Sequence, residues 1–387
     1  MLDQPQQIVD EPIPTSVQAF CNLAQPYAPD EANQALFIEA MAAITDWHMR
    51  HSPWYARFAR QQGINPDRIK TLADTIALPP VPAEFFKAHE IRSIHADQVA
   101  EHMTSSGTSG QKSQIFFDRF TIDHAREMVR RVMRVRGVED TQPANYLVNA
   151  YEPFSGFKVG TSRTNQFLMQ FAPVAEDFWS LRHIGDGKHE FDAFGAIAKL
   201  KQWAAGNTPV RIIGFPAFTY FLLQRMRQMQ EDHLTLPAGS MVLFGGGWKG
   251  YADQAISKPE LAQQIEQQLG IPPESVVESY GAVEHAIPYV DSPKHRLHQP
   301  SYSRVVIRDV RTMQPVADGT PGFLSFISPY ITSTPAHSVV MGDLAIRHPA
   351  DPDLEPDHPT PWFEILGRAG TASNKSCAAA AAEMLKS

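Results

Sequence analysis

The spacing of apolar side chains predicts that the chain begins with helices. Over residues 30–62 apolar positions recur every three or four residues, which is typical of an amphipathic helix; they include Phe37, Met41, Ile44 and Trp47. Ser52-Pro53 interrupts this pattern, and because the residue before a proline avoids helical backbone angles, we expect two helices. A further helix is expected over residues 121–136. We interpret its arginines as a solvated face: Arg126, Arg130, Arg131 and Arg134.

Strand-like and helix-like segments alternate in the middle of the chain. Strands are expected at residues 146–148, 210–213, 241–244 and 276–280, and helices at 192–205, 217–230 and 259–269. This alternation predicts an α/β fold, a large domain of layered, mostly parallel sheets and helices. Short strands with turn signals over residues 303–346 predict a smaller antiparallel or β-barrel-like section.

Composition and charge exclude several classes of protein. The net charge of −8 and the lack of a basic stripe argue against a nucleic-acid partner. The most apolar stretch, residues 210–223, is interrupted by Arg211 and Pro216 and is too short to span a bilayer. Cys21 and Cys377 form neither a disulfide framework nor a metal spacing, so we expect a reducing, cytoplasmic setting. The sequence leaves oligomerisation open.

Residues 104–113 carry the most distinctive local chemistry. Glycines permit close backbone approach to a ligand, hydroxyls donate hydrogen bonds, and a lysine adds positive charge. The segment precedes a short β-prone run, Gln114–Phe117, and predicts a loop that cradles a polyphosphate. It differs from a Walker loop in its glycine spacing. The alternative is a flexible Ser/Gly linker. The candidate residues are Thr104, Ser105, Ser106, Gly107, Thr108, Ser109, Gly110, Lys112 and Ser113.

Four further motifs follow this loop. They are Gly245-Gly246-Gly247-Trp248-Lys249 after a strand, Tyr280-Gly281-Ala282-Val283-Glu284, Gly342-Asp343 and Leu366-Gly367-Arg368. In this order they resemble the motifs of adenylate-forming enzymes, which activate a carboxylate with ATP to give acyl-AMP and pyrophosphate. The resemblance is greatest to the acyl-protein synthetases of bacterial luciferase operons and more distant to phenylacetate–CoA ligases. It extends from about Trp54 to Cys377.

The resemblance implies ATP and Mg²⁺ as cofactors. It places the 104–113 loop and Lys112 around the β- and γ-phosphates. Glu284 would ligate Mg²⁺, a hard cation that prefers carboxylate and phosphate oxygens. Asp343 would bind the ribose hydroxyls, and Arg368 matches the arginine before the family's hinge.

The resemblance also places the adenine and the acyl group. The Gly245–Gly247 backbone would run against both, although a tight turn after a strand explains these glycines equally well. Tyr280, which precedes Gly281, would pack on the adenine or the acyl site, or else be a core tyrosine. Five phenylalanines either line an acyl pocket or pack in the core: Phe154, Phe157, Phe215, Phe218 and Phe221.

The C-terminal part departs from the family pattern. After Arg368 the chain has Ala369-Gly370 in place of an acidic or lysine hinge residue, and we expect the family's usual C-terminal domain, with its catalytic lysine, to be reduced to a short tail. Lys249, Lys375 or Lys112 would then supply the missing charge. We expect a helical lead-in over residues 1–50, the adenylate-forming domain over 51–368 and the tail over 369–387.

Cys377 is a candidate acyl acceptor. A thiolate attacks acyl-AMP to give a thioester, and Lys375 would lower the thiol pKa. Without the resemblance we would interpret Cys377 as an incidental cysteine in a terminal segment.

Three hypotheses follow for function. The first is an ATP-dependent acyl-protein synthetase that activates a carboxylic acid, expected to be a fatty acid, and passes it through Cys377 to a partner resembling an acyl-CoA reductase. The second is a ligase that joins an aryl or fatty acid to CoA or a carrier protein. The third is a nucleotide-binding scaffold subunit without turnover.

Overall fold

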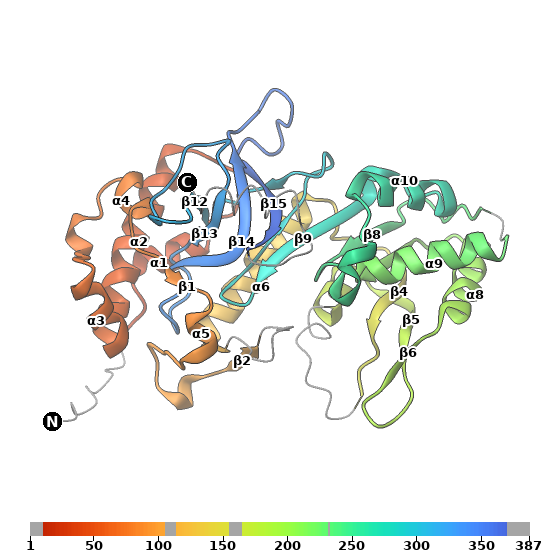
Figure 1. Ribbon diagram of the computed structural model, residues 1–387, viewed down its shortest axis with the longest axis horizontal. Coiled ribbons are helices and arrows are strands. Elements are labelled where there is room, and N and C mark those ends of the chain that lie inside the picture. Colours follow the sequence, from red (N-terminus) through yellow and green to blue (C-terminus); the bar gives the residue numbers. More distant parts are fainter. Residues whose placement is uncertain (1–10, 105–113, 155–164, 231–232, 370–387) are drawn as a thin grey trace. The chain divides into compact units, whose positions relative to one another are not determined.

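The computed structural model describes residues 11–104, 114–154, 165–230 and 233–369 (Figure 1). Contacts within the chain define two compact units. Unit 1 comprises residues 1–132, 281–289 and 298–387, and unit 2 comprises residues 133–280 and 290–297. The predicted division at residues 50 and 368 stays a prediction, and the helices of the expected lead-in lie within unit 1.

Unit 1 begins with the predicted pair of helices. α2 (Glu31–His51) starts after Asp30, whose carboxylate accepts the Asn33 N–H at 2.7 Å, and it ends at Ser52, which caps α3 (Pro53–Gln61). The break at Ser52-Pro53 is therefore confirmed. The other helices before the first long strands are short: α1 (Thr15–Cys21), η1 (Pro66–Arg68), α4 (Leu72–Ile76), α5 (Phe85–Ala88) and η2 (Ala96–Gln98).

The main sheet of unit 1 contains the predicted antiparallel section. In the described residues, its strand order is β11-β15-β14-β13-β12, and β1 pairs with β14 in parallel. Neighbours from β12 to β15 are antiparallel. The strands are β1 (Val81–Pro82), β11 (Leu297–His298), β12 (Arg304–Arg308), β13 (Gly322–Ile327), β14 (Ser338–His348) and β15 (Trp362–Arg368).

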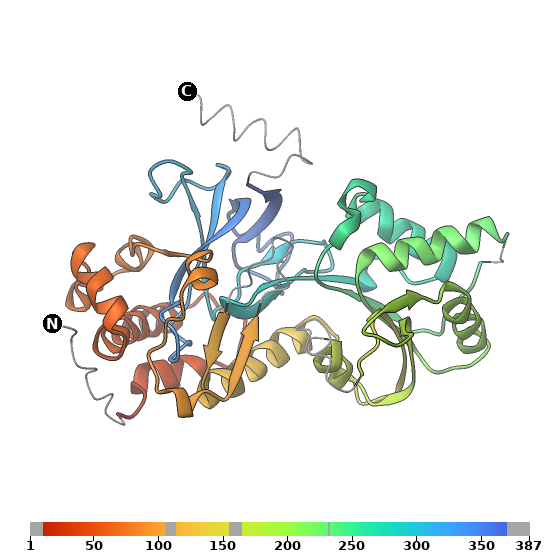
Figure 2. The ribbon, with the colours of Figure 1, turned by 60° about the horizontal axis from the view of Figure 1, so that its bottom comes forward.

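A separate hairpin in unit 1 joins β2 (Glu101–Thr104) to β3 (Gln114–Phe117), and α6 (Arg119–Val135) follows it. Figure 2 shows the orange hairpin beside the yellow α6 helix. The expectation that every α6 arginine is solvated is wrong for Arg131. Its guanidinium donates to the carbonyl oxygens of Cys21 at 2.9 Å and Leu23 at 3.0 Å, which ties α6 to the segment after α1.

Unit 2 is built on the predicted parallel sheet. Among the described strands the order is β10-β9-β8-β7-β4-β5-β6, with β5, β4, β7, β8 and β9 parallel and β6 antiparallel to β5. The strands are β4 (Ala144–Tyr151), β5 (Val174–His183), β6 (His189–Phe191), β7 (Val210–Gly214), β8 (Met241–Phe244), β9 (Val276–Ala282) and β10 (His285–Val290).

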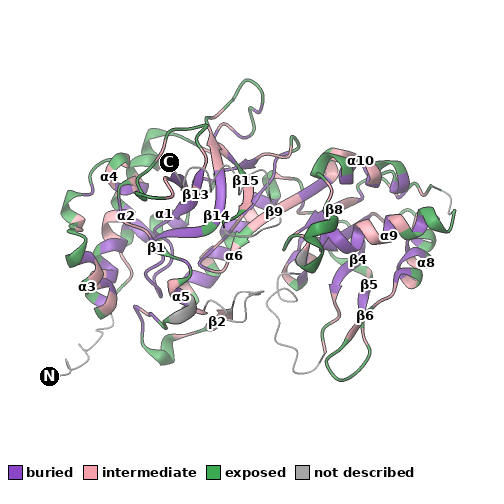
Figure 3. Ribbon diagram, in the orientation of Figure 1, coloured by how far each residue is buried: buried purple, intermediate pink, exposed green. Residues whose placement is uncertain are grey.

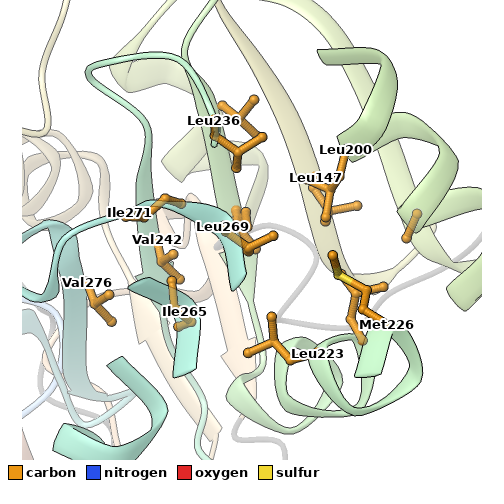
Figure 4. Packing of buried hydrophobic residues seen from close by; sticks show 14 of the residues in the cluster. Leu147, Leu200, Leu223, Met226, Leu236, Val242, Ile265, Leu269, Ile271 and Val276 are labelled. Carbon is orange, nitrogen blue, oxygen red and sulfur yellow. The ribbon is translucent and has the colours of Figure 1, made fainter. Parts of the chain in front are cut away.

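Three long helices of unit 2 bury one side against this sheet. They are α8 (Ala193–Ala204), α9 (Pro216–Gln228) and α10 (Lys258–Leu269). The short helices η3 (Met169–Phe171) and η5 (Pro273–Ser275) are single turns, and η4 (Lys249–Gln254) is interrupted by a kink at Tyr251. The apolar side chains of the three long helices interlock with those of the strands, and Figure 4 shows Leu200, Leu223, Ile265 and Leu269 around Leu147 and Val242. In Figure 3 the same helices are buried on one side and exposed on the other, as amphipathic surface helices are.

Local signals set the ends of α10 as predicted. The Ser257 side chain caps its start, Pro259 stands in its first turn, and Gly270 ends it with φ +69°. Across the described part of the chain, no helix is both long and apolar enough to cross a membrane.

Leu223 tests the core of unit 2. Its side chain is fully buried, so Leu223→Ala is expected to lower the free energy of unfolding by about 2–5 kcal/mol. The same substitution at Leu354, which is 41% exposed, is expected to change it by less than about 0.5 kcal/mol. Urea denaturation followed by tryptophan fluorescence measures both values, and equal effects would contradict the assigned packing.

Candidate active site

The predicted phosphate loop is bracketed by two paired strands. Thr104 ends β2 and Gln114 begins β3, and these two residues are direct partners in the antiparallel ladder. Residues 105–113, with Lys112, lie outside the described residues, as does the Thr104 side chain. β3 is anchored by buried Ile115, Phe116 and Phe117, so the two ends of the loop are held side by side.

The triple glycine lies at the carboxyl edge of the parallel sheet in unit 2. Gly245 follows β8 and donates its N–H to the Gly214 carbonyl at the end of β7, at 3.1 Å. Gly246 and Gly247 have φ of +79° and +64°, a left-handed conformation that glycine adopts at least cost. Ligands of open α/β sheets bind outside the carboxyl ends of the strands. The position of these glycines at that edge is therefore suited to ligand binding, as predicted.

Tyr280 lies on the neighbouring parallel strand. β8 and β9 pair through Phe244 and Glu278, and Ser279 donates its hydroxyl to the Phe244 carbonyl at 3.2 Å. Gly245 and the residue before Tyr280 are therefore close, because a Cβ on Gly245 would lie 3.4 Å from the Ser279 hydroxyl. The structure thus brings together the triple glycine and Tyr280, which are 33 to 35 positions apart in the sequence.

A buried polar cluster that the sequence analysis missed positions β9. The Asp291 carboxylate accepts the Glu278 N–H at 2.9 Å and lies 3.0 Å from His295 Nδ1. Arg136 donates to the backbone carbonyls of Asp291 and Glu274, both at 2.7 Å. No motif marks these residues. The available signal in the sequence is an aspartate that directly follows the apolar run 286–290.

Glu284 lies in the turn between β9 and β10, in unit 1. Its side chain is buried at 4% exposure, which is rare for a glutamate and unlike the solvated alternative. Gly281, before this turn, lies on β9. Next to Glu284, His285 is also buried. Its ring stacks on Phe326, with centroids 4.6 Å apart, and its Nε2 lies 3.1 Å from the Tyr289 hydroxyl.

Asp343 and Arg368 are brought together by strand register, also in unit 1. They are direct partners in the antiparallel β14–β15 pair, and Arg368 Nε lies 3.4 Å from Asp343 Oδ1. The Asp343 side chain is 12% exposed, whereas that of Arg368 is 61% exposed. A mostly buried carboxylate with one accessible edge is suited to accept hydrogen bonds from vicinal hydroxyls.

The remaining candidates cannot be placed completely. Lys249 begins η4, two residues after Gly247, but its side chain lies outside the described residues, as do Lys375 and Cys377. Cys21 is fully buried in α1, and desolvation raises the pKa of its thiol to about 12. Cys21 is therefore unreactive at neutral pH.

The described residues contain no group of three or more His, Cys, Asp or Glu side chains that could hold a metal ion. Glu284 therefore fits a cation only as a single protein carboxylate that shares the ion with phosphate oxygens, the manner in which Mg²⁺ is usually bound.

Comparison with solved structures identifies the fold. The chain is similar to a 2-hydroxyisobutyryl-CoA ligase with its acyl adenylate in the postadenylation state, with a TM-score of 0.64 and 16% identity over 89% of this chain and 69% of that one. An open conformation of that ligase, with the adenylate and CoA, gives a TM-score of 0.65 over 89% and 76% of the two chains, at 15% identity. The fold is that of adenylate-forming acid ligases.

The family is shown by the sequence profile of acyl-protein synthetase, LuxE, which matches residues 15–386. The chain belongs to this family and is an ATP-dependent, AMP-forming acid ligase. It is 24% identical to the long-chain-fatty-acid–luciferin-component ligase of Vibrio harveyi, over 86% of this chain and 83% of the relative. It is also 24% identical to the ligase of the same name from Aliivibrio fischeri, over 88% and 86% of the two chains.

His285 makes a testable prediction about pH. Burial lowers its pKa from 6.5 to about 3 in the folded protein. Above pH 6.5 the imidazole is neutral in both states and its stabilising contribution is complete; below it the unfolded chain binds a proton that the folded chain excludes. Below pH 6.5, His285 is thus expected to lower the free energy of unfolding by about 1.4 kcal/mol for each unit by which the pH falls.

Urea unfolding at several pH values between about 7.5 and 5 tests this. His285→Gln is expected to reduce the slope of stability against pH by that amount. The exposed His102→Gln is the matched control and should keep the wild-type slope. Identical slopes for both variants would show that His285 is protonated freely in the folded protein.

Proposed function

We propose that this protein activates a fatty acid with ATP and transfers the acyl group to its own Cys377. The fatty carboxylate oxygen attacks the α-phosphorus of ATP, and pyrophosphate leaves to give acyl-AMP. The Cys377 thiolate then attacks the acyl carbonyl and AMP leaves, so that a thioester forms. The observation that carries this proposal is the match to the acyl-protein synthetase family over residues 15–386, which includes both the loop and Cys377.

The state of the other cysteine supports Cys377 as the acceptor. The chain has two cysteines, and the thiolate rather than the thiol is the form of cysteine that attacks an acyl adenylate. Because Cys21 is buried with a raised pKa, it cannot serve. Any thioester on this protein therefore requires Cys377.

The side chains proposed for nucleotide binding have the chemistry that acyl adenylation needs. Catalysis of this step depends on positioning and on stabilising charge that develops on phosphate oxygens. In our proposal the 104–113 loop and Lys112 hold the leaving pyrophosphate, Asp343 accepts the ribose hydroxyls and Glu284 shares Mg²⁺ with the phosphates. Lys112, Lys249 and Lys375 are the candidates for a lysine that stabilises the negative charge of the adenylation transition state.

The names of the two relatives suggest which kind of molecule finally accepts the acyl group. Both are ligases that join a long-chain fatty acid to a luciferin component. We propose that the Cys377 thioester of this chain delivers its acyl group to a partner resembling an acyl-CoA reductase, in the cytoplasm, where thiols stay reduced.

Acyl transfer is tested by incubating the protein with ATP, Mg²⁺ and a radiolabelled fatty acid. The wild type and Cys21→Ala are expected to retain label that hydroxylamine releases, whereas Cys377→Ala should retain none. Cys377→Ala should still catalyse exchange between pyrophosphate and ATP, because adenylation precedes transfer. Label on protein in the absence of Cys377 contradicts the proposal, and label found only on added CoA would instead favour a CoA ligase.

Nucleotide binding makes a separate prediction. Asp343→Asn replaces a charged acceptor of hydrogen bonds, a loss worth about 1.5–3 kcal/mol, so the KM for ATP in pyrophosphate exchange is expected to rise about 10- to 100-fold. Asp318→Asn is the control, since Asp318 pairs with Arg347 away from the adenylation motifs. Equal KM values for the two variants would remove Asp343 from the ribose site.

A further inference from the structure

A cavity in unit 2 has no role in the mechanism so far. It has a volume of about 620 Å³, within the range of small-molecule sites, and lies between the β5–β6 hairpin, the start of α8 and the second half of α9. Its apolar lining comes from Ile184, Phe191, Ala193, Phe194 and Phe221.

Two of the apolar lining residues are strongly exposed. Phe194 is 60% exposed and Ile184 is 57% exposed, the two largest values among the exposed large apolar side chains of the described residues. Apolar surface gathered in a concave site is typical of ligand binding, whereas single exposed residues are not.

Four charged residues line this cavity, Arg182, Glu190, Asp192 and Arg225, and three of them contact other side chains or the backbone. Asp192 caps α8 by accepting the Gly195 N–H at 2.8 Å. Arg182 forms an ion pair with Glu152 at 3.4 Å, and the Arg225 guanidinium lies 5.4 Å from the centre of the Phe194 ring. The long arginine stems can therefore cover an apolar ligand while their charged heads stay in water. This arrangement favours an apolar occupant over an anion.

A continuous row of aromatic rings joins this cavity to the segment that follows the triple glycine. We call these five rings the aromatic track. Neighbouring centroids are 5.5 Å apart for Trp248 and Tyr220, 5.9 Å for Tyr220 and Phe221, 4.9 Å for Phe221 and Tyr251, and 5.9 Å for Tyr251 and Phe218.

The track meets the cavity at two points. Phe221 belongs to both, and Phe218 lies 5.2 Å from the cavity residue Phe191. At its other end, Trp248 directly follows Gly247, where the acyl carbonyl is proposed to lie.

We infer that the distal part of the acyl chain lies along the aromatic track and ends in this cavity, with Phe221 limiting its length. The inference rests on the proposed function, because the fatty carboxylate must be activated beside the triple glycine. A chain that is bound there by its carboxyl group and extends along the track reaches the cavity with its methyl end. Each buried methylene contributes about 0.8 kcal/mol, or roughly fourfold in affinity.

Acid-dependent pyrophosphate exchange with octanoate, dodecanoate, tetradecanoate and hexadecanoate tests this. Phe221→Trp fills the space and is expected to lower kcat/KM for the longest acid about fourfold for each methylene excluded, with octanoate little changed. Phe221→Ala should move the optimum toward longer acids. Phe167→Ala is the matched control: Phe167 is also half-buried in unit 2 but lines neither the cavity nor the track, and it should keep the wild-type profile.

A second measurement separates this inference from the proposed function. Binding of the fluorescent fatty acid cis-parinarate needs no catalysis, and Phe221→Trp is expected to weaken it while Phe167→Ala does not. Weakened binding with no exchange by the wild type would overturn the proposed function and support the cavity. Wild-type exchange with the same chain-length profile and the same parinarate affinity in both Phe221 variants would overturn the inference. Phe194→Ala, at an exposed position, gives the same test should Phe221→Ala fail to fold.

Discussion

Close backbone approach at Gly214 is the constraint on which the edge of the parallel sheet depends. A Cβ at this position would lie 2.4 Å from the Asn149 carbonyl oxygen, so only glycine lets β7 end against β4 there. The Gly214 carbonyl then accepts the Gly245 N–H, which aligns the start of the triple glycine with the ends of β4 and β7. Main-chain atoms form this hydrogen bond, so substitutions at other positions leave it in place. A side chain at Gly214 would disrupt it, because there is no room for a Cβ atom.

Within each unit, a different kind of interaction positions the candidate residues. In unit 2 the candidate residues lie at strand ends, and the buried Asp291 carboxylate fixes β9 through backbone hydrogen bonds. In unit 1 they depend on register: Asp343 and Arg368 meet because β14 and β15 are antiparallel partners there. A slip of one residue would turn Asp343 to the other face of the sheet, so the pairing of these strands is itself part of the site.

Burial determines the charge states of Cys21 and of His285, the histidine beside Glu284. Desolvation disfavours the charged forms of both side chains, the thiolate of Cys21 and the imidazolium of His285. Both side chains are therefore neutral at neutral pH. Cys377 is therefore the cysteine that we propose as the acyl acceptor. The aromatic track adds what the adenylation motifs lack, an apolar surface on which a long hydrocarbon chain can lie.

Local rules were sufficient to predict much of this protein from its sequence. Proline at 53 and glycine at 270 set helix ends, and the apolar run at 241–244 predicted a central strand, because these effects act within a few residues. The order of motifs, from the phosphate loop to Cys377, indicated the family. The tertiary structure alone decided that Arg131 holds the carbonyls of Cys21 and Leu23, and that Arg136 meets Asp291, 155 positions away. Such contacts join segments that are distant in sequence, and no local pattern specifies which buried donor will meet which acceptor.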